Sequence, residues 1–190
     1  MSSKNSISRI VITLACAFVA LFEVLNLLDV FKHIKYYPFL DLIVAIVIPL
    51  ALIGFCALAI LKGDNKDTLV ALALTAYAGI NSAWIFIKAC EALANGWFSI
   101  DYIVSLSFYL ILGLFAAKNF LPTGAKEQLN TPLLQIIALI AIWFMPIFQM
   151  FILPLFTAQG GIAGRVGGQI LITLLEWLLQ SIAFTWFIKE

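Results

Sequence analysis

Charged side chains are scarce in this chain, and those present nearly balance. The 190 residues include 11 Lys and Arg against 10 Asp and Glu, for a net charge of +1. This balance excludes both a basic surface for nucleic acid and an acidic tail. The chain is 64% hydrophobic with a mean hydropathy of +1.09, whereas soluble proteins are about one quarter charged. The composition therefore predicts an all-α integral membrane protein.

The residues that most often bind metals or carry out catalysis are also rare. His33 is the single histidine, and Cys16, Cys56 and Cys90 form no C-x-x-C pair. Haem ligation by paired histidines, zinc-dependent proteolysis and di-iron chemistry all need more ligands than these. The sequence contains no G-x-S-x-G elbow, dinucleotide fingerprint or Walker loop. We therefore expect no enzyme activity, no catalytic residue, no metal and no other cofactor.

Long apolar runs fill most of the sequence. A helix needs about 20 apolar residues to cross the hydrocarbon core of a bilayer. The sequence offers six such runs, at about 8–31, 39–61, 68–94, 99–121, 132–156 and 166–188. These runs predict a bundle of six transmembrane helices, with residues 1–190 forming one transmembrane domain. Five crossings are the alternative if residues 157–190 are partly re-entrant.

Residues typical of helix ends mark the borders of these runs. Asp67 precedes the third run, and Ser99 opens the fourth. Thr131 followed by Pro132 is an N-cap with a first-turn proline before the fifth run. Asn95-Gly96 predicts a tight turn between the third and fourth runs.

The distribution of Lys and Arg predicts the orientation of the bundle. Six crossings place Lys4, Arg9, Lys62, Lys66, Lys118, Lys126 and Lys189 on one side, and Lys32, Lys35, Lys88 and Arg165 on the other. The side richer in Lys and Arg faces the cytoplasm. We therefore expect both termini in the cytoplasm, with the lipid bilayer of a plasma membrane or bacterial inner membrane around the helices.

A few polar residues lie inside the apolar runs, where an ionisable group suggests a functional site. In the predicted topology they gather in the outer half of the membrane, and Glu176 lies roughly 12–15 Å below the outer end of the last run. The candidate ligand-binding or proton-linked residues are Glu23, Asn26, Lys88, Gln149 and Glu176. A structural ion pair of Lys88 with Glu23 or with Glu176 is the alternative interpretation.

Two prolines interrupt the apolar runs. Pro49 lies in the second run and Pro146 in the fifth, so each occupies the middle span of a three-span half. Proline removes a backbone hydrogen bond from a helix and often bends it. Inverted halves with broken helices are typical of transporters, so we interpret both prolines as candidate hinges.

These features favour small-solute binding or transport through a polar site in the outer half of the membrane. A non-catalytic subunit or effector of a larger membrane complex is the alternative, and so is a self-associating pore. The partners expected are accordingly a small-molecule substrate, protein subunits or further copies of the chain, and no nucleic acid.

Overall fold

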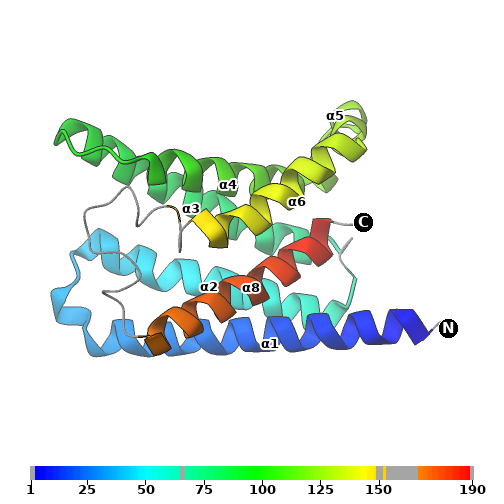
Figure 1. Cartoon of the computed structure of the whole chain (residues 1–190), viewed down its shortest axis with the longest axis horizontal. Helices are drawn as coiled ribbons and strands as arrows, with labels where there is room; N and C mark the ends of the chain where they lie inside the picture. Colours follow the sequence, from blue (N-terminus) through cyan, green and yellow to red (C-terminus); the bar gives the residue numbers. More distant parts are fainter. Residues whose placement is uncertain (1–2, 65–66, 149–151, 153–166, 189–190) are drawn as a thin grey trace.

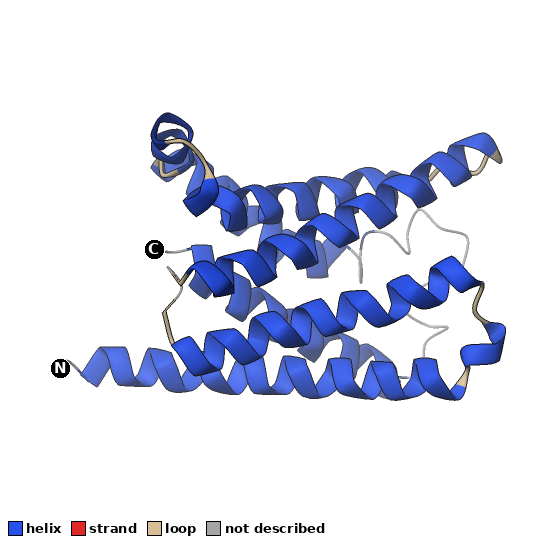
Figure 2. Ribbon diagram, turned by 180° about the vertical axis from the view of Figure 1, so that it is seen from behind, coloured by secondary structure: helices blue, strands red, loops and turns tan. Residues whose placement is uncertain are grey.

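A computed structural model describes residues 3–64, 67–148, 152 and 167–188 of the chain. Within these ranges every regular element is a helix and no strand occurs, as the sequence predicts (Figure 2). The elements are α1 (Ser3–Lys32), η1 (Ile34–Tyr36), α2 (Phe39–Lys62), α3 (Thr68–Ala94), α4 (Ile100–Ala116), η2 (Ala117–Phe120), α5 (Thr123–Leu129), α6 (Pro132–Ile147) and α8 (Gly167–Ile188).

The long helices pack into a closed ring. Each contacts the next in the order α1, α2, α3, α4, α6 and α8, and α8 returns to contact α1. Figure 1 shows that the start of α1 and the end of α8 lie at the same end of the bundle. The ring brings the last described helix against the first.

Local capping explains where the helices begin. The side chain of Asp67 accepts a hydrogen bond from the backbone N–H of Leu69 at 2.9 Å, so α3 starts at the predicted position. Ser99 caps α4 in the same way through the N–H of Asp101, at 3.4 Å. Such caps satisfy N–H groups that have no partner within their own helix.

The α-helix of the fourth apolar run ends earlier than the sequence predicts. α4 stops at Ala116 and a short 3-10 helix follows, instead of one helix over 99–121. Pro122 accounts for the extended backbone of Leu121, which ends this segment, because a residue that precedes proline is disfavoured in the α conformation. α6 runs from Pro132 to Ile147, and of the later residues in the predicted run 132–156 only Phe148 and Ile152 are described, so the predicted end of that run lies outside the described residues.

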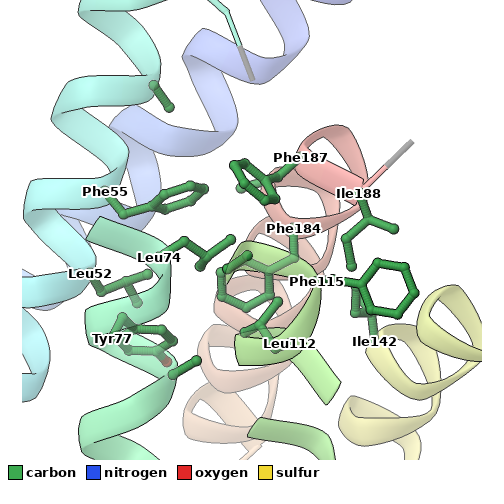
Figure 3. Packing of buried hydrophobic residues seen from close by; sticks show 14 of the residues in the cluster. Leu52, Phe55, Leu74, Tyr77, Leu112, Phe115, Ile142, Phe184, Phe187 and Ile188 are labelled. Atoms are coloured by element: carbon green, nitrogen blue, oxygen red, sulfur yellow. The ribbon is translucent and has the colours of Figure 1, made fainter. Parts of the chain in front are cut away.

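Aromatic side chains fill the centre of the ring (Figure 3). Phe55 of α2 packs against Phe184 and Phe187 of α8, with ring centroids 6.0 and 6.3 Å apart. Tyr77 of α3 contacts Phe184 at 6.0 Å and Tyr109 of α4 at 5.8 Å. Aromatic side chains of α2, α3, α4 and α8 thus pack against one another inside the bundle.

The outside of the bundle is apolar as well. Large side chains along one face of α1 are about half exposed, among them Leu14, Phe18, Leu21, Leu25 and Leu28. Three helices are long and apolar enough to cross a membrane, over Ser8–Lys32, Phe39–Lys62 and Thr68–Ala94. Shorter apolar helices cover Ile100–Ala116, Pro132–Ile147 and Ile172–Ile188. These features indicate an integral membrane protein, while the count of six crossings stays a prediction.

Candidate functional site

Two glutamates form the centre of the candidate site. Glu23 of α1 is only 7% exposed, and its Oε2 accepts a hydrogen bond from the Asn26 amide at 3.3 Å. Glu176 of α8 is half-buried, and its Oε1 accepts one from the Gln180 amide, also at 3.3 Å. Each carboxyl group is therefore held by an amide three or four residues further along its own helix, which is the spacing that places side chains on one helix face.

Glu23 and Glu176 lie on two helices, α1 and α8, that pack against one another. The side chain of Asn26 is also close enough to interact with the Glu176 carboxyl, and the two glutamates act on one another electrostatically. We call Glu23, Asn26, Glu176 and Gln180 the carboxyl site. Three of the five predicted site residues are thus neighbours, and Gln180 joins them.

Two tyrosines complete the surroundings of the carboxyl site. Tyr77 and Tyr109 are 3% and 8% exposed, and both interact electrostatically with Glu23 and with Glu176. Their rings meet edge to face, at an interplanar angle of 72°. Sequence reasoning missed them. The available signal was that a tyrosine hydroxyl within an apolar run needs a polar partner.

Lys88 does not belong to the carboxyl site. Its Nζ lies 3.2 Å from Asp41 Oδ1 at the start of α2 and 3.0 Å from Glu91 Oε2 on its own helix, over the ring of Trp84. The predicted ion pair with Glu23 or Glu176 is therefore wrong. Lys88 lies near the end of α3, where the antiparallel α2 begins, so the closest acids come from those two helices.

Asn81 of α3 is buried, and its side-chain amide donates to the carbonyl of Tyr77 in its own helix at 2.9 Å. Gln149 lies outside the described residues. The described site therefore rests on α1 and α8, with the tyrosines of α3 and α4 beside it.

The two candidate hinge prolines are both buried. Pro49 lies within α2, ten residues after its start at Phe39. Pro146 lies one residue before Ile147, the last residue of α6, and residues 149–151 beyond it lie outside the described part of the chain. The hinge role of both prolines stays a prediction.

The chemistry of the carboxyl site is that of an acid and amide cluster. Among the described residues, no three His, Cys, Asp or Glu side chains group closely enough to hold a metal ion. Paired carboxyl groups with amide and phenol neighbours can bind a proton or a cationic group, and can donate or accept hydrogen bonds to a polar ligand. Comparison of the chain with models of known protein families, with curated protein sequences and with solved structures found no match.

Proposed function

We propose that this chain is a six-span membrane protein that binds and transports a small solute at the carboxyl site. The observation that carries the proposal is that Glu23 and Glu176, on two contacting helices, are each held by an amide of their own helix and act on one another electrostatically. An ionisable group at the centre of a membrane helix costs about 2.5–3.5 kcal/mol on insertion scales. Two such groups beside one another are an arrangement that packing alone does not require.

The depth of the two glutamates supports a common site in the outer half. Glu23 lies nine residues before the end of α1 at Lys32, and Glu176 lies nine residues after the start of α8 at Gly167. Both are therefore about 14 Å from the same end of the bundle, at 1.5 Å per residue. With the termini in the cytoplasm, that end faces outward.

The charge of the site favours a cationic or proton-linked solute. Two neighbouring carboxyl groups repel one another when both are ionised, and a proton or a positively charged group between them relieves this repulsion. Lys88 is engaged by Asp41 and Glu91, away from the site. A proton or a bound cation would then balance the charge of Glu23 and Glu176.

Native mass spectrometry of the protein released gently from its host membrane tests this proposal, because it detects retained small molecules without knowing them in advance. We expect a bound molecule that disappears in Glu176→Gln and in Glu23→Gln while both variants keep the wild-type thermal unfolding temperature. Glu91→Gln is the matched control, since Glu91 is an exposed glutamate paired with Lys88. It should retain the bound molecule.

Other outcomes would contradict the proposal and identify its alternatives. If Glu23→Gln and Glu176→Gln lower the unfolding temperature and no variant or wild type carries a molecule, the carboxyl site is structural. A stable complex with other proteins would then favour a subunit role. Ion leakage from liposomes that contain this chain alone would favour a self-associating pore.

A further inference from the structure

The hydroxyl group of Ser181 fills a hydrogen-bonding gap that Pro146 creates. Proline has no N–H, so the carbonyl of Ile142, four residues earlier in α6, loses its helical partner. Ser181 of α8 donates a hydrogen bond to this carbonyl oxygen at 3.2 Å. Ser181 is 1% exposed and Ile142 2% exposed, so neither group has ready access to water. An unpaired carbonyl would be strongly unfavourable there.

A second hydrogen bond joins the same two helices. Trp143 Nε1, one residue after Ile142, donates to Thr185 Oγ1 at 3.1 Å. Thr185 follows Ser181 by four residues, so both side chains lie on the face of α8 that meets α6. Two bonds one helical turn apart oppose sliding of α8 along α6.

We propose that Pro146 frees the Ile142 carbonyl as a fixed acceptor, and that Ser181 is a positioning residue that sets the depth of α8 through it. Glu176 lies five residues before Ser181 on the same helix, so the register of α8 decides where this carboxyl group meets Glu23. The two hydrogen bonds to α6 fix the register of α8 whatever the protein binds, whereas the effect of this register on ligand binding rests on the proposed function. In this account Pro146 serves as a lock between helices rather than as a hinge.

A double-mutant cycle measured by thermal unfolding of the full chain in detergent tests the lock. Ser181→Ala should lower the unfolding temperature by about 3–8 °C, because it leaves the Ile142 carbonyl unpaired. In a Pro146→Ala background the restored N–H serves this carbonyl, so the same substitution should shift the temperature by less than about 2 °C. Equal shifts in the two backgrounds, or no shift in either, would overturn the proposal.

Two further variants serve as controls. Thr185→Val removes the other bond between α6 and α8 and does not involve the Ile142 carbonyl, so its effect should be the same with and without the Pro146→Ala substitution. Ser181→Thr keeps the hydroxyl group and should stay within about 2 °C of wild type, which gives a measurable comparison even if Ser181→Ala folds poorly. Because Ser181 is buried, the added methyl group of Thr can itself cost stability, so only a loss in Ser181→Thr as large as that in Ser181→Ala, together with equal losses of Ser181→Ala in both Pro146 backgrounds, would point to packing and against the lock.

Distances between spin labels test whether the lock positions the carboxyl site. Leu25 and Leu175 are about half exposed on α1 and α8, beside the site residues, and can carry labels once the exposed Cys90 is replaced by serine. Ser181→Ala and Pro146→Ala should broaden or shift this distance, and Ser181→Thr should not. An unchanged distance despite lower stability would make Ser181 a stabilising contact only. The distance between the labels is measured without a ligand. A negative result would therefore contradict the lock without contradicting the proposed function.

Discussion

Gly63 at the end of α2 occupies a position that a side chain would disturb. Its φ of 62° is in the left-handed region, and a Cβ atom there would lie 2.9 Å from Nη2 of Arg9. The guanidinium group of α1 therefore packs directly over the glycine that ends α2. Gly63 thus serves both the turn into α3 and the contact between α1 and α2.

We therefore expect Gly63→Ala to lower the free energy of unfolding by about 1–2 kcal/mol, from backbone strain and displacement of Arg9. Chemical denaturation in mild detergent measures the change. Gly54→Ala is the control, because Gly54 lies inside α2 with no atom within 4 Å of the added Cβ. It should be neutral or stabilising by up to about 1 kcal/mol. Equal effects of the two substitutions would show that neither the turn nor Arg9 matters.

The single residues of the candidate site were partly predictable. Glu23 and Glu176 stood out because a carboxyl group inside an apolar run is unfavourable unless something compensates for it. What compensates depends on which helices are neighbours, and apolar runs carry little information about that. The sequence therefore leaves open whether Lys88 pairs with Glu23 or Glu176 or binds a ligand, whereas in the structure it pairs with Asp41 and Glu91, and the sequence does not single out Tyr77 and Tyr109.

The ion pairs of Lys88 link α2 and α3 and can be tested by substitution. The Nζ atom of Lys88 contacts Asp41 of α2 and Glu91 of α3, and these three side chains are 30–50% exposed. Partly exposed ion pairs contribute about 0–1 kcal/mol. The apolar contact between these helices, which includes Phe55, Leu74 and Tyr77, should hold them together without Lys88.

We expect Lys88→Gln to lower the free energy of unfolding by about 1 kcal/mol or less. It should also leave unchanged any small molecule that Glu176→Gln releases. Denaturation together with native mass spectrometry checks both points. Asp41→Asn removes one of the two ion pairs of Lys88 and leaves the pair with Glu91, so it should destabilise the protein no more than Lys88→Gln and should also retain the bound molecule. Loss of the bound molecule in Lys88→Gln alone would return this lysine to the site.

Helix starts were easier to predict than helix ends. Asp67 and Ser99 each accept a hydrogen bond from the backbone N–H two residues later, so these helix starts can be predicted from the sequence alone. α4 ends at Ala116 inside an apolar run, at a position that neither a glycine nor a proline directly after it marks in the sequence. The order of helices around the ring depends on how side chains of different helices pack together, and this cannot be read from any one apolar run.

Closure of the ring by α8 against α1 is the feature on which the candidate site depends most. It brings Glu176, near the end of the chain, beside Glu23 near its beginning. From the sequence, the two glutamates share a depth only if the chain crosses the membrane six times. The number of crossings therefore decides whether both carboxyl groups lie in the same half of the membrane.

Cysteine labelling of intact cells tests this topology. Lys35 lies between α1 and α2, and Glu127 lies in α5, with three predicted crossings between them. In a Cys90→Ser background, a membrane-impermeant maleimide should label Lys35→Cys from outside, and should label Glu127→Cys and Glu190→Cys only after permeabilisation. Cys16 and Cys56 are fully buried and should stay unlabelled.

Each result of this labelling bears on a different part of the predicted topology. The Lys35→Cys change removes one positive charge from the predicted outer side, so it reinforces the expected orientation. The opposite labelling pattern would reverse the bundle and place the carboxyl site in the inner half. Labelling of Glu190→Cys and Glu127→Cys from opposite sides would show that α6 and α8 do not both cross. In that case the six-span topology would fail, and with it the proposed placement of both carboxyl groups in the outer half on two antiparallel spanning helices.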